Sequence, residues 1–234
     1  MTGDRDIIIE NIDELRSRVA AAAARAGRDP AGIKIVAVTK TVEPERIMAA
    51  YQCGITDFGE NRVQELVQKA DIMNVECKWH MIGHLQTNKV KYIIDRVCMI
   101  HSLDSIELAN EINRRAEKAG RIMDALVQVN VAGESTKYGV EPASAPDFVK
   151  EVSRMGNIRI RGLMTIAPLV SDPEEVRWVF RGLRQLLIDI GKENIDNVSM
   201  EYLSMGMSND FEVAIEEGAN IIRPGTVIFG KRKS

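Results

Sequence analysis

The chain has 234 residues, of which 45% are hydrophobic and 28% are charged. This composition is typical of one globular domain and unlike that of a disordered or collagen-like chain. The formal net charge of −3 argues against a nucleic-acid-binding protein, because such proteins present a basic face that displaces counterions from phosphates. The cysteines Cys53, Cys77 and Cys98 are odd in number and widely spaced, which indicates free thiols in a reducing compartment. We therefore expect a single domain over residues 1–234, located in the cytoplasm.

The first predicted element is an amphipathic helix. Ile8, Ile12, Leu15 and Val19 recur at helical spacing with charged residues between them. The segment before them, MTGDRD, is acidic rather than basic, so it does not resemble a secretory signal. No apolar run approaches the roughly 20 residues that cross a bilayer, and we expect no membrane association.

Beyond this helix, short apolar runs alternate with amphipathic stretches, a pattern typical of parallel βα units. The predicted strands are residues 33–40, 55–60, 78–83, 97–102, 124–130, 158–166, 198–205 and 220–225. Eight parallel strands close a barrel, and the length lies within the barrel range of about 200 to 400 residues. A doubly wound open sheet is the alternative, but VTKTVEP stands where that fold carries a glycine-rich phosphate turn. We predict an α/β fold, a single (β/α)8 TIM barrel with an extra N-terminal helix.

Capping chemistry predicts where several helices begin and end. Helix starts favour a small polar residue followed by a carboxylate three residues later, or a proline in the first turn, and helix ends favour glycine. The residues that carry these signals are Pro44, Asp104, Pro173 and Asn209 at helix starts and Gly120 and Gly191 at helix ends.

In barrels of this kind, functional residues lie at the carboxyl ends of the strands. The polar residues predicted there are Lys40, Asn61, His84, Ser102, Asn130 and Arg223. Lys40 shares strand parity with Val36 and Val38, so it points into the barrel if they do. Partial desolvation lowers the pKa of an ammonium group and makes a neutral amine available for a Schiff base with an aldehyde or ketone. Taken alone, however, a lysine at a strand end is more often simply solvated.

Two short glycine-containing segments, SMGMSND (204–210) and RPGTVIFG (223–230), follow the seventh and eighth predicted strands, where barrels commonly bind phosphate. Their glycines let the backbone approach an anion, and hydroxyls of Ser208 and Thr226 can donate to it. A phosphate at one edge and an aldehyde at another are the features of pyridoxal 5′-phosphate (PLP). Arg223 is placed to meet the ring nitrogen of that cofactor. An arginine there makes the ring a poorer electron sink than an aspartate would.

At these residues the sequence resembles the pyridoxal phosphate homeostasis proteins, whose fold is like the barrel domain of alanine racemase. The resemblance covers nearly the whole chain. The matching segments are AVTKTVEPERI, DFGENRVQE, WHMIGHLQTNKVK, HSLDS, VQVNVAGESTKYG, GLMTIAP, YLSMGMSND and RPGTVIFG. Met81 and Pro224 depart from the family pattern, which has an aromatic and an aliphatic residue at these places.

The resemblance implies a role for each predicted site residue. Lys40 is the Schiff-base lysine, and Arg223 is the partner of the ring nitrogen. Asn61 and Met205 belong to the pocket wall. The implied phosphate ligands are Gly206, Ser208, Gly225 and Thr226.

The implied function is a non-enzymatic PLP carrier that acts in vitamin B6 homeostasis. We expect a monomer, with PLP-dependent apo-enzymes as candidate recipients of the cofactor. The alternative is a PLP-dependent racemase or lyase, but two-base racemisation needs an acid/base that a separate β domain supplies in alanine racemases, and this sequence ends soon after the second glycine segment. An aldolase that uses Lys40 directly and a scaffold with an incidental lysine remain further alternatives. His80 and His84 straddle a strand end, so we expect no metal site.

Overall fold

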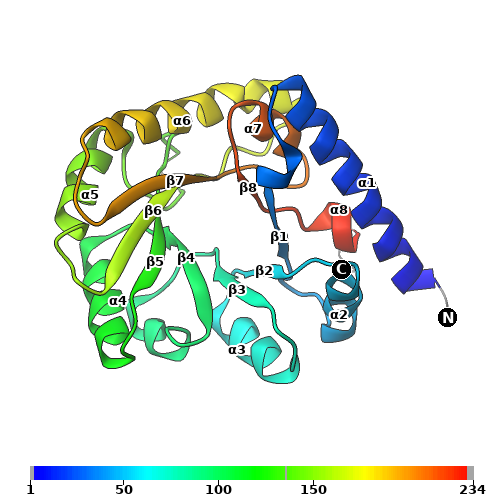
Figure 1. Ribbon diagram of the computed structural model, residues 1–234, viewed down its shortest axis with the longest axis horizontal. Helices are drawn as coiled ribbons and strands as arrows, with labels where there is room; N and C mark the ends of the chain where they lie inside the picture. Colours follow the sequence, from blue (N-terminus) through cyan, green and yellow to red (C-terminus); the bar gives the residue numbers. More distant parts are fainter. Residues whose placement is uncertain (1–2, 135, 231–234) are drawn as a thin grey trace.

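The computed structural model, which describes residues 3–134 and 136–230, is a closed barrel of eight parallel strands surrounded by helices (Figure 1). Neighbouring strands pair in chain order, and β8 returns to pair with β1. The strands are β1 (Lys34–Val38), β2 (Asp57–Glu60), β3 (Lys78–Met81), β4 (Val97–Leu103), β5 (Met123–Gln128), β6 (Ile158–Met164), β7 (Val198–Ser204) and β8 (Ile221–Ile222). The predicted barrel and all eight predicted strands are confirmed. Strand β8 is shorter than predicted, although the carbonyl of Pro224 still accepts from the amide of Val38 in β1 at 2.8 Å.

Eight α-helices and four short 3-10 helices lie in the described part of the chain. The α-helices are α1 (Gly3–Arg25), α2 (Pro44–Gln52), α3 (Val63–Ile72), α4 (Ile106–Lys118), α5 (Ala145–Val152), α6 (Arg177–Lys192), α7 (Phe211–Glu216) and α8 (Thr226–Phe229). The 3-10 helices are η1 (Pro30–Gly32), η2 (Thr87–Tyr92), η3 (Pro142–Ser144) and η4 (Pro173–Val176). Within the described ranges, none of these helices has the length and apolarity to cross a membrane.

The extra N-terminal helix is α1, which lies outside the barrel along α7 and α8 (Figure 1). The four apolar residues that predicted it, Ile8, Ile12, Leu15 and Val19, are all buried in the main core. Asn11 also donates to the carbonyl of Ile228 at 2.9 Å. Helix α1 therefore holds the last helix in place, next to the loops that follow β7 and β8.

Half of the predicted helix boundaries are confirmed. Pro44 begins α2, Pro173 begins η4, and Gly120 follows α4 with φ +63°. Gly191 was predicted to end a helix but lies inside α6, and Asn194, at φ +49°, takes the left-handed conformation after that helix. Asparagine tolerates this conformation better than most residues, so a glycine was not needed there.

The two predicted polar caps are wrong by one residue each. Helix α4 is capped by Ser105, whose hydroxyl accepts from the amide of Leu108 at 3.2 Å, while Asp104 contacts a histidine of the β3 loop. Helix α7 begins after Asp210 rather than after Asn209. In both places two adjacent residues have cap-forming side chains, and only the tertiary contacts decide between them.

Two kinds of core fill the molecule. The larger one lies between the helices and the outside of the barrel. A small apolar cluster inside the barrel consists of Val36, Met99, Leu126, Met164 and Ile221. The rest of the interior is unusual because it is polar, with buried histidine, serine and arginine side chains that are described below.

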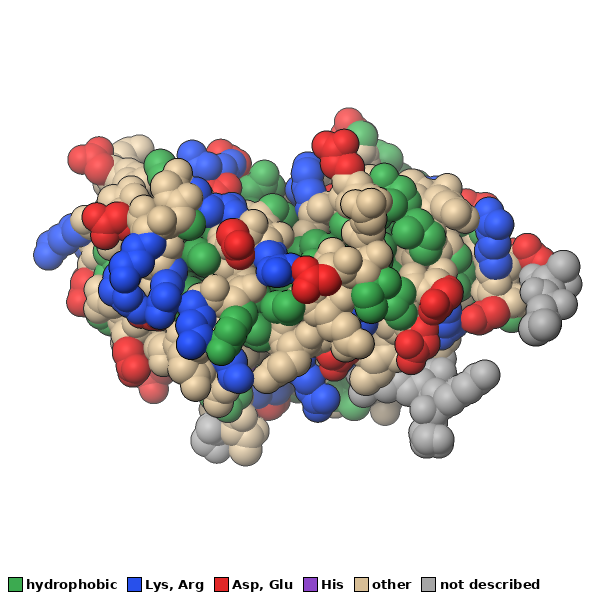
Figure 2. Space-filling model, turned by 90° about the horizontal axis from the view of Figure 1, so that it is seen from below, with side chains coloured by type: hydrophobic (Ala, Val, Ile, Leu, Met, Phe, Trp, Pro, Cys, Tyr) green, Lys and Arg blue, Asp and Glu red, His purple; other side chains and the backbone are tan. Residues whose placement is uncertain are grey.

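The surface carries charges of both signs. On the face that Figure 2 shows, basic and acidic side chains are interspersed with hydrophobic ones. An ion-pair network joins α1 and α6 to α7, where Arg25 and Arg177 both contact Glu216 at 2.6 Å. Such partly exposed pairs contribute little to stability individually, so their main effect is to orient neighbouring helices.

Replacement of Gly162 by alanine should strongly destabilise the barrel. Gly162 has φ +148° and pairs with Tyr202 of β7, whose carbonyl oxygen would lie 2.0 Å from an added Cβ. We expect a loss of at least about 3 kcal/mol in the free energy of unfolding, measured by urea titration. The control is Gly156→Ala, an exposed site where an added Cβ meets nothing within 4 Å. Equal free energies of unfolding for the two variants would show that the close approach of Tyr202 does not exclude a side chain at position 162.

Candidate functional site

A cavity of about 830 Å³ opens at the carboxyl end of the barrel. Its wall includes the last residue of β1 and the turn that begins at Lys40, the loops after β6 and β7, and the start of α8. Six of the eight predicted site residues line it, namely Lys40, Asn61, Ser208, Arg223, Gly225 and Thr226. The lysine of the first βα unit and the loops of the last two thus open into the same cavity.

Lys40 lies in the turn after β1, because the strand ends at Val38 rather than at residue 40 as predicted. Val36 lies in the apolar cluster inside the barrel, and Val38 and the half-buried Lys40 both line the cavity. The next residue, Thr41, has φ +61°, and its amide donates to the carboxylate of Glu65 at 2.8 Å. This bond holds a strained turn immediately after the lysine.

A buried ion cluster that the sequence did not predict supports this turn. The ammonium of Lys69 donates to the carbonyl of Thr39 at 2.7 Å and to Glu60 at 2.7 Å, and it lies 3.2 Å from Glu65. Glu60 is fully buried, and burial raises its pKa although Lys69 and Thr39 donate to it. The backbone on both sides of Lys40 is therefore bonded to one charged cluster.

Arg223 is a buried cation in the wall of the cavity. Its Nη1 donates to the hydroxyl of Ser204 at 2.6 Å, and its Nη2 donates to the carbonyl of Thr165 at 2.8 Å. Burial lowers the pKa of Arg223 to about 10, against the attraction of Asp210. The guanidinium therefore stays charged at neutral pH, and N–H groups beyond these two remain to meet a ligand.

The loops after β7 and β8 are bonded to each other. The hydroxyl oxygen of Ser208 accepts from the amides of Gly225 at 3.0 Å and Val227 at 3.4 Å. Gly206 has φ +92°, and an added Cβ would lie 2.7 Å from the Cβ of Ala214. A glycine is therefore required at this turn for conformation and packing.

Two predicted site residues lie elsewhere. Met205 is fully buried, and neither it nor Gly206 is among the residues that line the cavity. The carbonyl of Gly206 instead accepts from the amide of Arg223 at 2.8 Å. These two residues join β7 to β8 beneath the cavity wall.

Asn61 contributes a buried side-chain oxygen that can accept a hydrogen bond. Its Oδ1 is buried and has no hydrogen-bond partner among the residues that the structure describes. Gly83 packs so closely that an added Cβ would lie 2.5 Å from the carbonyl oxygen of Asn61. A buried oxygen without a donor is costly, so a ligand that donates to Asn61 would fit this place. Three basic side chains, Lys40, Arg46 and Arg223, and the hydroxyls of Ser208 and Thr226 line the same cavity, which suits it to a phosphorylated aldehyde.

The other polar strand-end residues do not line the cavity. Asn130 donates to the carbonyl of Glu134 within its own loop. His84 stacks on Tyr138 with ring centroids 3.7 Å apart, which joins the loops after β3 and β5. His80 is buried inside the barrel, and no cluster of three metal-binding side chains occurs in residues 3–134 and 136–230.

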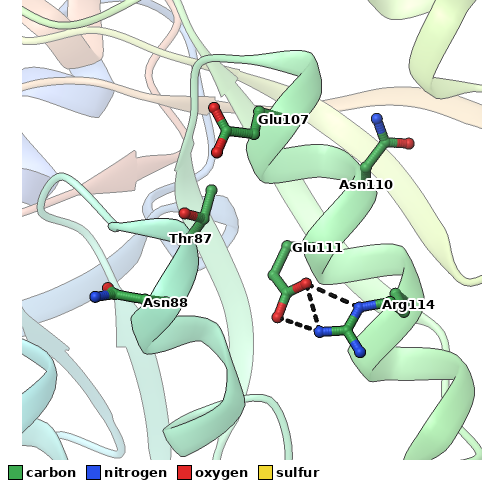
Figure 3. A pocket seen from close by; sticks show the side chains of 6 residues that line it. All are labelled: Thr87, Asn88, Glu107, Asn110, Glu111 and Arg114. Carbon is green, nitrogen blue, oxygen red and sulfur yellow. Dashed lines mark hydrogen bonds and ion pairs between the residues drawn. The ribbon is translucent and has the colours of Figure 1, made fainter.

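A second hollow, of about 380 Å³, lies between η2 and α4 (Figure 3). Its lining residues come from η2, which carries Thr87 and Asn88, and from α4, which carries Glu107, Asn110, Glu111 and Arg114; the side chain of Asn88 points away from α4. The carboxylate of Glu111 is already bonded to Arg114 at 2.7 Å. None of the predicted site residues lies there, so the barrel-end cavity is the candidate site.

Comparisons with known proteins agree with the fold. The family model of the alanine racemase N-terminal domain matches residues 10–233. The pyridoxal phosphate homeostasis protein of Aquifex aeolicus is 47% identical over 96% of this chain and 98% of its own, and that of Pseudomonas aeruginosa is 37% identical over 96% of each. The structure of PipY from Synechococcus elongatus with PLP bound is 33% identical with a TM-score of 0.83, covering 95% of this chain and 100% of PipY.

Replacement of Lys69 by methionine should destabilise the protein by about 3 to 5 kcal/mol near pH 7, because it leaves Glu60 buried without a cation. The folded-state pKa of Glu60 lies above its unfolded value, so the folded state binds the extra proton and the loss should be smaller at pH 5 than at pH 8. Urea unfolding at the two pH values measures this difference.

The double variant Glu60→Gln, Lys69→Met should recover part of the lost stability, since no buried charge remains. Lys118→Met, on the exposed side of α4, serves as the control and should have little effect. A Lys69→Met variant as stable as the control would show that the cluster does not support the turn.

Proposed function

Because this chain belongs to the pyridoxal phosphate homeostasis protein family, which shares the alanine racemase N-terminal domain, we propose that it binds PLP and acts in vitamin B6 homeostasis. The observation that carries this proposal is the shared cavity, in which Lys40 faces the same space as Arg223 and the two glycine-containing loops. The PLP that is bound to PipY supports the choice of ligand.

We assign the phosphate to the loops after β7 and β8. The hydroxyls of Ser208 and Thr226 are the donors. The amide of Gly225 donates to the oxygen of Ser208 at 3.0 Å, which leaves the proton of that hydroxyl available to the phosphate. A phosphate oxygen that accepts from charged or strongly polarised donors forms short, strong bonds. The contribution of Gly206 is indirect, since it shapes the turn that presents Ser208.

We assign the covalent bond to Lys40. Lys40 would hold the aldehyde carbon of PLP as a Schiff base, formed with release of one water molecule. Arg223 would lie at the ring nitrogen as a cation and donate a hydrogen bond to it. Bound PLP supplies an electron sink, and this arrangement weakens that sink, which favours holding the cofactor over carbanion chemistry.

A carrier without turnover is the form of this function that the cavity supports best. Among the described residues, no tyrosine, histidine or cysteine lines the cavity, and its carboxylates are those of Asp4, Glu43 and Asp210. The tyrosine that alanine racemases use as a second acid/base therefore has no counterpart in the described wall. Leu169 is 86% exposed at its rim, which leaves the mouth accessible. We expect a cytoplasmic monomer that passes PLP to apo-enzymes.

Borohydride reduction of the protein loaded with PLP should attach the cofactor irreversibly to Lys40. In Lys40→Ala we expect the label to disappear and the affinity for PLP to fall at least about tenfold, because the covalent bond is lost. Peptide mass mapping and the visible absorption band measure both effects. Lys91→Ala, at an exposed lysine, is the control. A full label at another lysine would overturn the assignment, and sustained turnover of an amino acid would overturn the carrier function.

Replacement of Ser208 by alanine should weaken PLP binding about tenfold or more, as expected when one donor to a charged group is lost. At saturating PLP the borohydride label on Lys40 should persist, because the lysine is intact. Ser199→Ala is the matched control, since Ser199 lies at the other end of β7 and donates to Glu201, far from the proposed phosphate loops. Unchanged affinity in Ser208→Ala, measured by fluorescence titration, would place the phosphate elsewhere.

A further inference from the structure

A continuous chain of polar side chains crosses the inside of the barrel and ends at Arg223. Asp57 Oδ1, at the start of β2, lies 2.9 Å from His80 Nε2, and His80 Nδ1 lies 2.9 Å from His101 Nε2. His101 Nδ1 in turn lies 2.9 Å from the hydroxyl of Ser204, which accepts from Arg223 at 2.6 Å. His80, His101 and Ser204 are at most 1% exposed, so bulk water does not compete for these bonds.

The two ends of this chain are charged and the rings between them are neutral. Burial raises the pKa of Asp57, but the bond from His80 and the nearby Lys34 outweigh it and lower the pKa to about 2. Burial lowers the pKa of His80, only partly offset by Asp57, and lowers the pKa of His101 well below its usual value. Cys98 also contacts His80 Nε2, at 3.3 Å, and burial raises its pKa to about 12, so this thiol adds no charge.

These protonation states permit one direction of donation. A carboxylate only accepts, so His80 donates from Nε2 to Asp57 and, as a neutral ring, accepts at Nδ1. His101 must then donate from Nε2 and accept at Nδ1. The hydroxyl of Ser204 therefore donates to His101, which leaves its oxygen lone pairs to accept from Arg223.

We propose that Asp57, His80, His101 and Ser204 are positioning residues that act through this one-way chain to hold the guanidinium of Arg223 toward the ring nitrogen of the cofactor. The inference rests on the proposed function. The carbonyl of Thr165 accepts from Nη2 of the guanidinium, so both terminal nitrogens of the planar group have a fixed partner. The carboxylate of Asp57, at the amino end of the barrel, thus determines the orientation of the Arg223 guanidinium at the carboxyl end.

Loss of the acceptor at Asp57 has a defined consequence for each ring. His80 is then free to carry its proton on Nδ1, where it donates to His101 Nε2. His101 must then carry its own proton on Nδ1 and donate to Ser204. That bond competes with the bond from Arg223, since one hydroxyl oxygen then receives two donors and needs a new acceptor for its own proton.

The first test reads the ring tautomers by long-range ¹H–¹⁵N NMR of the histidine-labelled protein without PLP. In the wild type we expect the proton on Nε2 in both His80 and His101. Asp57→Asn should keep this pattern, because the amide oxygen still accepts. Asp57→Leu should populate the Nδ1 form of both rings. Thr56→Val, the control, removes only the bond to the other carboxylate oxygen and should leave both rings unchanged.

The second test measures the affinity for PLP and the absorption maximum of the bound cofactor. Asp57→Leu should weaken binding about tenfold and shift the maximum, whereas Asp57→Asn and Thr56→Val should stay within about twofold of the wild type. If Asp57→Leu does not fold, Ser204→Ala breaks the chain next to Arg223 and should give the same loss and the same shift, with His80 still protonated on Nε2.

The outcomes separate this inference from the proposed function. A wild-type His101 that carries its proton on Nδ1 would overturn the direction of the chain whether or not PLP binds. Tautomer changes without any change in affinity or absorption maximum would overturn the positioning role. Failure of the wild type to bind PLP would overturn the proposed function, and the positioning role with it.

Discussion

The structure depends on keeping the charged guanidinium of Arg223 out of water at the carboxyl end of the barrel. The side chain is 3% exposed, and its hydrogen-bond partners in the described part of the chain, Ser204 and Thr165, are both neutral acceptors. Such a cation is stable only where oriented dipoles replace its hydration shell. The polar chain through the barrel supplies those dipoles, and a carboxylate, Asp57, lies at its far end.

Two buried cations near the cavity are stabilised in different ways. Lys69 lies against Glu60 and Glu65, so its charge is compensated where it stands. Arg223 has no carboxylate among its hydrogen-bond partners in the described residues, and its positive charge therefore extends into the cavity. The first cation holds the backbone around Lys40, and the second is available to a ligand. This division of roles suits a site that binds an anion and presents an amine.

The same features support the proposed role of holding the cofactor rather than turning over a substrate. In the proposed binding mode, a cation at the ring nitrogen would limit the ability of the ring to accept electrons. The strongly polar groups of the barrel interior are used to orient Arg223 rather than to face a substrate. The alanine racemase N-terminal domain thus serves here as a binding site in which the protein supplies shape, charge and one amine.

The sequence alone determined the strand count, the barrel, the place of Lys40 beyond the carboxyl end of β1 and the two loops that face it, because these follow from period-two hydrophobic patterning and from the common geometry of parallel strands. It did not reveal the cluster of Glu60 and Lys69, the polar chain from Asp57 to Arg223, or which of two adjacent residues caps α4 and α7. Those features join residues up to 103 positions apart along the chain, as in the bond between His101 and Ser204. Their partners are set by the register between strands and by side-chain packing, and neither leaves a local signal in the sequence.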